Sequence, residues 1–148
     1  MSQTILAIDD SKKILDIIKY FLEQEGYTVK AFTVPEEGLK VAKEGGIDLI
    51  LLDIMMPGMD GYTLFDHLRK SPATAEVPVI MLTAKAIILH TPKDFFYGLY
   101  GFLAKPFSKQ QLIKLVAECL GLTGKTGKGE PFIRKVGEDE ERPEGPAK

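Results

Sequence analysis

The stretch Leu49-Ile50-Leu51-Leu52-Asp53-Ile54-Met55-Met56-Pro57-Gly58-Met59-Asp60-Gly61 decides the fold. Its first four residues are apolar, and such a run bounded by Pro and Gly is typical of a parallel strand covered on both faces. Pro57-Gly58 then turns the chain, and a helix is expected to begin near Asp60. Asp53 therefore stands at the carboxyl end of a strand, where α/β proteins bind ligands. Alone, an Asp in this position is equally typical of a turn or a cap.

A second apolar run, Thr4–Ile8, is followed by two adjacent acids, Asp9 and Asp10. Neighbouring carboxylates repel each other, and with Asp53 nearby each would favour its protonated form unless a cation neutralised the cluster. Mg²⁺ suits such a site because it is held by one or two carboxylates together with waters and phosphate oxygens. Helix N-capping is the alternative role, with Ser11 as a competing cap. It explains one of the two acids and hardly both.

Two further predicted strands end in polar residues. The run from Val77 to Leu82 precedes Thr83, and the run from Gly101 to Ala104 precedes Lys105. A phosphoryl group on a carboxylate needs a metal on one oxygen, a cationic side chain on another and a hydroxyl donor on the third, because phosphoryl transfer is catalysed mainly by positioning and charge neutralisation. Four converging strand ends therefore favour a phosphoryl site over four unrelated surface residues.

Strand and helix patterns alternate along the chain. A helix pattern runs to Glu25, a strand covers Thr28–Phe32, and a helix covers about Pro35 to Glu44 before the strand that leads to Asp53. Alternating units of this kind predict a parallel sheet with right-handed crossovers and helices on both faces. Five such units fit, so the expected fold is an α/β, (βα)5 three-layer sandwich with a five-stranded sheet.

These motifs resemble the receiver domains of two-component response regulators. The acidic pair Asp9-Asp10, the Asp53–Gly61 segment, Thr83-Ala84 and Lys105-Pro106-Phe107 stand in the order and spacing of that family, over about Thr4 to Leu120. The resemblance implies a flavodoxin-like sheet of order 2-1-3-4-5, whose switch point lies between the first and third strands.

The resemblance also implies the roles of individual residues. Asp53 would be the phosphoacceptor. Asp10 and Asp53 would bind Mg²⁺ (or Mn²⁺) directly, Asp9 through water, and Met55 through its backbone carbonyl. The phosphoryl-binding and switch positions would be Thr83, Ala84, Lys105 and Phe102, with Phe102 as the aromatic residue that moves with Thr83.

The implied function is that of a phosphoacceptor in a two-component phosphorelay. The phosphoryl donor would be a histidine kinase or a histidine phosphotransfer protein, since His67 and His90 are unsuited to serve as an internal donor. Phosphorylation would shift the face formed by the fourth helix, fifth strand and fifth helix between two conformations, and a downstream protein or output domain would read it. The chain would not be an enzyme beyond its own phosphorylation and dephosphorylation. The face could also form a homodimer.

Composition predicts one domain over residues 1–122, which by resemblance is the receiver, and a flexible tail over 123–148. The 148 residues suit a single core, and the tail is rich in Gly, Pro and charge, with Phe132, Ile133 and Val136 as its large apolar residues. No apolar run approaches the length that spans a bilayer, and the start of the chain lacks a signal-peptide pattern, so a cytoplasmic location without membrane contact is expected. The net charge of −2 predicts no direct nucleic-acid binding. Cys119 falls among apolar residues at helical spacing and is expected in the core.

Two places depart from the usual receiver pattern: the stretch from Ile87 to Tyr100, and Phe102, where the family often has Tyr. The stretch from Ile87 to Tyr100 is unusually apolar, and Thr91-Pro92 resembles a helix start, so this stretch either packs inward or forms a contact surface with Phe95, Phe96, Tyr97 and Tyr100. Met55 stands where, by resemblance, a residue flanks the water route to the phosphoryl group. Because Met cannot orient water, we expect slow self-dephosphorylation.

Three other classes of protein are considered. A phosphorylation-independent receiver-like module for protein interaction or dimerisation is favoured by the unusual apolar stretch and opposed by the intact acids, Thr83 and Lys105. A hydrolase with an aspartyl-phosphate intermediate commonly has a second Asp two residues after the nucleophile, and here that residue is Met55. A flavin-binding protein would need a Ser/Thr/Gly-rich phosphate loop in place of Asp9-Asp10-Ser11-Lys12.

Overall fold

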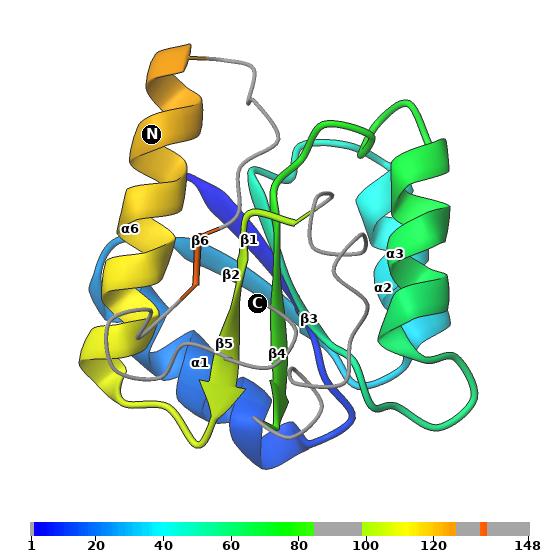
Figure 1. Ribbon diagram of the computed structural model, residues 1–148, viewed down its shortest axis with the longest axis horizontal. Helices are drawn as coiled ribbons and strands as arrows, with labels where there is room; N and C mark the ends of the chain where they lie inside the picture. Colours follow the sequence, from blue (N-terminus) through cyan, green and yellow to red (C-terminus); the bar gives the residue numbers. More distant parts are fainter. Residues whose placement is uncertain (1, 85–98, 127–133, 136–148) are drawn as a thin grey trace, which may run out of the picture.

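The computed structural model describes residues 2–84, 99–126 and 134–135, and it shows a parallel sheet between two layers of helices (Figure 1). The strands are β1 (Thr4–Ile8), β2 (Thr28–Phe32), β3 (Leu49–Asp53), β4 (Val79–Ala84), β5 (Gly101–Lys105) and β6 (Arg134–Lys135). The helices are α1 (Lys12–Gln24), α2 (Pro35–Lys43), α3 (Gly61–Lys70) and α6 (Lys109–Thr126). The sheet order is β2-β1-β3-β4-β5-β6 and every pair is parallel. The predicted order 2-1-3-4-5 is confirmed, and β6 adds a short sixth strand.

The core lies on both faces of the sheet because successive side chains of a strand point to opposite sides. On β1, Ile5 and Ala7 pack with buried residues of α1 and α6, whereas Leu6 and Ile8 pack on the opposite face, which α2 and α3 cover. All five residues of β3 are buried, which explains why its first four residues, Leu49 to Leu52, are all apolar. Cys119 of α6 is fully buried as predicted, and burial raises the pKa of its thiol to about 12.

Local sequence determines where the helices begin. Ser11 caps α1 by accepting a hydrogen bond from Ile14 N at 3.2 Å, and Asp60 caps α3 by accepting one from Thr63 N at 2.8 Å. These side chains satisfy backbone N–H groups that have no partner within the helix. The helix start predicted near Asp60 is confirmed, and the cap of α1 is Ser11, so capping of α1 does not explain Asp10.

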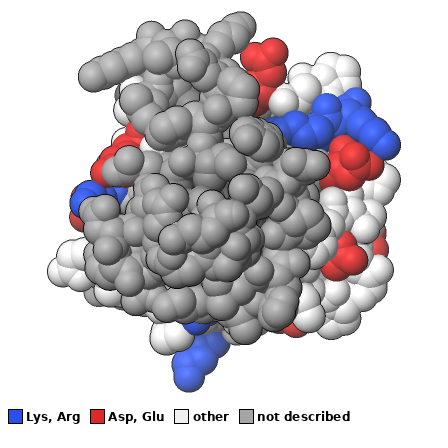
Figure 2. All heavy atoms as spheres, in the orientation of Figure 1, with Lys and Arg blue, Asp and Glu red and all other residues white. Residues whose placement is uncertain are grey.

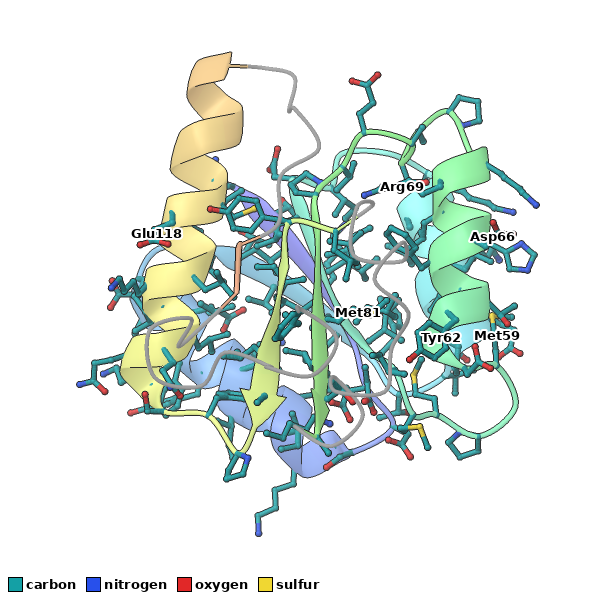
Figure 3. The ribbon with its side chains drawn as sticks, viewed as in Figure 1. Met59, Tyr62, Asp66, Arg69, Met81 and Glu118 are labelled. Carbon is teal, nitrogen blue, oxygen red and sulfur yellow. The ribbon has the colours of Figure 1, made fainter. Side chains whose placement is uncertain are left out.

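Arg69 holds the connection between α3 and β4 (Figure 3). Its guanidinium donates hydrogen bonds to Thr74 O at 3.1 Å and to Val77 O at 2.9 Å, and it lies 4.7 Å from the centroid of the Phe65 ring. Burial lowers the pKa of the Arg69 guanidinium from its ordinary value. Thr74 is fully buried, and its hydroxyl donates to the carbonyl of Leu68. This connection therefore fixes where β4 enters the sheet.

Some boundaries differ from those expected. The fourth strand runs from Val79 to Ala84 instead of from Val77 to Leu82, so Thr83 lies within the strand. Leu99 and Tyr100 are buried in the core, so Tyr100 does not contribute to an exposed contact surface. The rest of the apolar stretch, residues 87–98, lies outside the described residues. Helix α6 continues to Thr126, beyond the predicted domain boundary at residue 122.

Candidate functional site

The carboxyl ends of the central strands bring the predicted site residues together. Asp9 directly follows β1, and Asp53 is the last residue of β3, which pairs with β1. Lys105 is the last residue of β5. Thr83 of β4 is paired with Ala104, the residue that precedes Lys105. Asp9, Asp53 and Thr83 are buried, with at most 3 % of each residue exposed. Buried polar side chains at a strand end are uncommon unless they are paired or bind a ligand.

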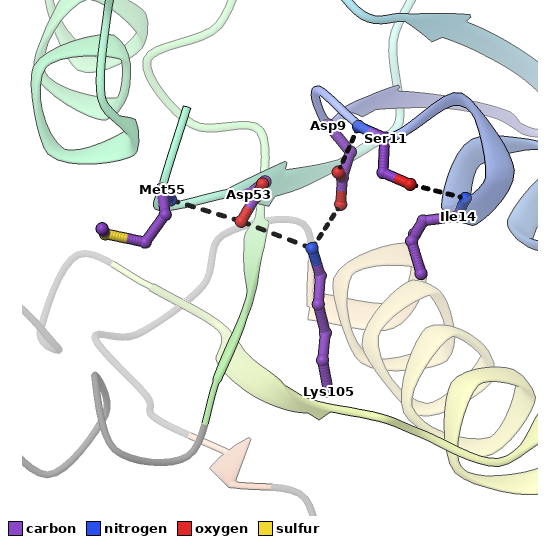
Figure 4. A network of polar contacts seen from close by, with 6 residues as sticks. All are labelled: Asp9, Ser11, Ile14, Asp53, Met55 and Lys105. Atoms are coloured by element: carbon purple, nitrogen blue, oxygen red, sulfur yellow. Dashed lines mark hydrogen bonds and ion pairs between the residues drawn. The ribbon is translucent and has the colours of Figure 1, made fainter. Parts of the chain in front are cut away.

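Lys105 bridges the two buried acids (Figure 4). Its Nζ lies 2.7 Å from Asp9 Oδ2 and 3.5 Å from Asp53 Oδ1. The other oxygen of Asp9 accepts a hydrogen bond from Ser11 N at 2.9 Å, and Asp53 Oδ1 accepts one from Met55 N at 3.3 Å. These contacts hold both carboxylates in fixed orientations at the end of the sheet.

The charge of Lys105 does not balance the acidic cluster. Burial and the neighbouring Asp9 carboxylate raise the pKa of Asp53 to about 7, against an ordinary value of 3.8, even though Lys105 and the Met55 N–H act in the opposite direction. Asp10 contributes a smaller upward effect on the same pKa. Ionised Asp53 is therefore poorly stabilised by the protein alone, and a bound cation would lower its pKa.

The geometry fits a hard divalent cation. Asp9, Asp10 and Asp53 each offer a carboxylate oxygen, and these oxygens lie within 4.8 Å of one another. Asp9 and Asp53 are buried, whereas Asp10 is exposed, so the cluster has one side open to solvent. Mg²⁺ accepts carboxylate ligands of this kind while keeping several waters, and Mn²⁺ accepts similar ligands. The predicted convergence of the three acids is thus present in the structure.

Thr83 supplies a hydroxyl that has no hydrogen-bond partner among the described residues, although its Oγ1 is buried. Leaving a buried hydroxyl unsatisfied costs about 1–3 kcal/mol. A group bound at the end of β4 would satisfy it. This is the second feature of the site, besides the excess of acid, that is stabilised only when a ligand is present.

Gly61 is a positioning residue that we did not predict. A Cβ at Gly61 would lie 2.6 Å from the backbone oxygen of Asp53 and 2.6 Å from Ile54 Cα. Its N–H donates to Ile54 O at 2.7 Å, which closes the loop between β3 and α3. The Asp60-Gly61 pair in the sequence indicated a helix start, but the close approach to Asp53 depends on the three-dimensional path of the loop.

The other predicted residues are placed as follows. Met55 is 60 % exposed beside Asp53, and Ala84, the last residue of β4, is exposed. Phe102 of β5 is buried in the core layer that includes Met81 of β4. The Lys105–Pro106 peptide bond is cis. His67 is exposed on α3, whereas Leu64, Phe65 and Leu68 are buried.

None of the helices in the described part of the chain combines the length and apolar content that a bilayer-spanning helix requires. Around the edge of the face shown in Figure 2, both acidic and basic side chains of the described residues are visible.

A doubly wound sheet of order 2-1-3-4-5 that carries an acidic cluster, a Lys and a Thr at its carboxyl edge defines a receiver-type protein. Residues 5–117 match the response regulator receiver domain family. The chain belongs to this family, and the predicted resemblance is confirmed.

The relatives in this family include transcriptional regulators. The chain is 37 % identical over 119 residues to the DNA-binding dual master transcriptional regulator RpaA of Synechocystis, covering 80 % of this chain and 49 % of that protein. It is 34 % identical over 116 residues to the probable transcriptional regulator ycf29 of Porphyra purpurea, covering 78 % of this chain and 56 % of that protein. The chain thus spans about half the length of these relatives.

Solved structures show the same fold. The receiver domain of the sensor histidine kinase PA1611 from Pseudomonas aeruginosa, described with a magnesium ion coordinated in its active-site cleft, is 28 % identical with a TM-score of 0.72, covering 82 % of this chain and 99 % of that one. A response regulator receiver domain from Clostridium thermocellum is 28 % identical with a TM-score of 0.75, covering 83 % and 98 %. The predicted fold class is confirmed.

Proposed function

We propose that this domain accepts a phosphoryl group on Asp53, in a Mg²⁺-dependent reaction, from a histidine kinase or a histidine phosphotransfer protein. The observation that carries the proposal is the Asp53 carboxylate, which lies beside Lys105 within a cluster of three acids and whose pKa is raised by burial and then by the neighbouring carboxylates. The histidine-derived donor is proposed from the family. The receiver with magnesium in its cleft, from Pseudomonas aeruginosa, supports the choice of metal.

Each residue has a role in this mechanism. Asp9, Asp10 and Asp53, with the Met55 carbonyl, would hold the metal, which supplies charge neutralisation when bound. One oxygen of Asp53 would attack the phosphorus in line, and the phosphohistidine nitrogen would leave. Lys105 would move from the carboxylate pair to a phosphoryl oxygen. The unpartnered hydroxyl of Thr83 would donate to another phosphoryl oxygen.

The signal would arise from movement of Thr83 toward the phosphoryl group. Phosphorylation adds about two negative charges at one point. Ala84 lies next to Thr83 at the end of β4, and Phe102 lies two residues before Ala104, the residue aligned with Thr83. A shift of Thr83 would alter the packing around Phe102, so a downstream protein or output domain would bind one conformation better than the other. Homodimerisation through the face that includes β5 and α6 is one possible readout.

We further propose that the domain works in the cytoplasm, catalyses no reaction beyond its own phosphorylation and dephosphorylation, and does not itself bind nucleic acid. RpaA is named as DNA-binding, but it is about twice as long as the matched region. A DNA-binding function would therefore belong to residues outside the receiver match. The boundary between receiver and tail is proposed at residue 122, because the family match ends at residue 117, and the last turn of α6 would then belong to the tail.

The test is phosphorylation of the full chain by a small acyl phosphate, followed by intact mass. With Mg²⁺ we expect a gain of one phosphoryl group in the wild type and in the control variant Asp16→Asn, which alters an exposed acid of α1. We expect no gain in Asp53→Asn or in metal-free buffer. Asp10→Asn should require a higher Mg²⁺ concentration. A folded wild type that gains no mass would overturn the proposal and favour a phosphorylation-independent interaction module.

A further inference from the structure

The β5 edge of the sheet is paired with a segment from the C-terminal tail. Arg134 and Lys135 form β6, which runs parallel to β5 with Arg134 opposite Gly101 and Lys135 opposite Phe102 (Figure 1). An unpaired edge strand exposes a row of backbone donors and acceptors that other chains can use. In this structure a tail segment occupies the first part of that row, at Gly101 and Phe102.

The tail sequence is suited to this position. Arg134 and Lys135 are flanked by Phe132, Ile133 and Val136, and the stretch is bounded by Pro131 and Gly137. Apolar and β-branched residues bounded by Pro and Gly are typical of a strand. These are also the large apolar residues of the tail, which otherwise consists mainly of Gly, Pro and charged residues. The composition and the pairing therefore point independently to the same segment.

The hydrogen-bond pattern identifies which backbone groups face the tail. Ile50 N donates to Pro78 O and Ile54 N donates to Leu82 O. The backbone N–H and C=O groups of even-numbered residues in and beside β4 therefore point toward β3, and those of its odd-numbered residues point toward β5. Ile80 is opposite Gly101, so in a parallel ladder Gly101 and Leu103 bond to β4. The backbone N–H and C=O of Phe102 then point toward β6. Those of Arg134, which is opposite Gly101, point back toward β5. Lys135 faces away.

We propose that the β5 edge is an interaction surface for an extended strand, and that its resident occupant is the chain's own segment around Arg134–Lys135. Residues 127–133 connect the end of α6 to this strand, and seven residues can span at most about 25 Å. A short tether of this kind gives an effective concentration on the order of 1 mM. A partner strand that pairs with β5 must first displace the tail.

The test is amide hydrogen exchange of the full chain, with two matched proline variants. Arg134→Pro removes the N–H that faces β5, whereas Lys135→Pro removes one that faces away, which an edge strand tolerates. Each variant loses one positive charge. We expect the Phe102 amide to exchange at least about tenfold faster in Arg134→Pro and at the wild-type rate in Lys135→Pro. The Leu103 amide, which points toward β4 in the same ladder, should be unchanged in both.

Several results of these experiments would overturn the proposal. Equal Phe102 exchange in the wild type and Arg134→Pro, or equal acceleration in both variants, would overturn the proposal. Slower Phe102 exchange at higher protein concentration would show pairing with a second copy and overturn the intramolecular assignment. A synthetic peptide of residues 130–137 at several mM should restore protection in Arg134→Pro, since it exceeds the effective concentration of the tether, and failure to restore it would also overturn the proposal.

Discussion

Buried polar groups before β4 have hydrogen-bond partners, whereas those at its carboxyl end are not fully satisfied. Before β4, the Arg69 guanidinium donates to two carbonyls and the Thr74 hydroxyl donates to a third. At its carboxyl end, Thr83 has a buried hydroxyl with no partner among the described residues, and Asp9 and Asp53 share one Lys. Satisfied buried polar groups stabilise a fold, whereas unsatisfied ones cost free energy that a ligand can recover. The first region is built for stability and the second for binding.

The largest expected effect that separates the regions is produced by Asp53→Asn. The variant lacks the nucleophilic carboxylate, so acyl phosphate labelling should fall at least about 100-fold. Its metal-free unfolding free energy at pH 7.5 should rise by about 1–3 kcal/mol, because a poorly stabilised buried charge is removed. Intact mass and urea denaturation measure the two quantities. A variant that is less stable than the wild type would show that Asp53 contributes to the fold in the same way as Arg69.

The pH dependence of stability tests the same comparison. The pKa of Asp53 is raised to about 7 in the folded protein and is 3.8 ordinarily, so between these values the folded state binds more protons than the unfolded state. Stability from this group is therefore fully present below about pH 4 and is lost as pH rises toward 7. Without metal, the wild type should lose on the order of 3 kcal/mol relative to Asp53→Asn over this range.

Denaturation of both proteins across pH 4 to 8 provides the measurement, and the variant removes the contribution of all other groups. Millimolar Mg²⁺ should reduce the wild-type loss because the cation stabilises ionised Asp53. A wild-type minus variant difference that stays constant with pH would contradict the electrostatic description of the site.

Arg69→Met should lower the stability of the fold and leave labelling of Asp53 nearly unchanged, which is the opposite of the effects expected for Asp53→Asn. Loss of the two hydrogen bonds and the contact with Phe65 should destabilise the fold by about 2 kcal/mol. Labelling of Asp53 under folding conditions should stay within about twofold of the wild type. Lys70→Met is the control, since Lys70 is exposed and its ion pair with Asp66 contributes little. A large labelling defect in folded Arg69→Met would mean that the two ends of β4 are coupled.

The sequence predicted the sheet and the convergence of the acids because both follow from the order of strands. Apolar runs that end in Asp9, Asp53, Thr83 and Lys105 must bring these residues to one edge of a parallel sheet. The limits of the fourth strand were less predictable, since Val77 and Pro78 are as apolar as the strand itself and the Arg69 contacts determine where pairing begins. Tyr100 was one residue of the contact surface considered as an alternative, and its burial next to β5 excludes it from such a surface.

Features that depend on distant contacts could not be predicted. The contact between Gly61 and the Asp53 backbone requires the loop path, and β6 requires pairing with β5, a strand that ends 29 residues earlier (134 minus 105). The tail composition, taken as a whole, indicated a linker. The register with Gly101 and Phe102 identifies Arg134–Lys135 as the residues of the tail that pair with β5.

Met55 offers the smallest effect and the finest test of the binding region. Its side chain is 60 % exposed and its N–H donates to Asp53, so a substitution should leave the fold and the labelling intact while changing what stands beside the phosphoryl group. Met55→Asn introduces groups that can orient a water for attack, and the half-life of phosphorylated Asp53 should shorten by about three- to tenfold. Met55→Leu controls for shape. Mass measured over time after donor removal gives the half-life, and equal half-lives in all three proteins would place control of hydrolysis elsewhere at the site.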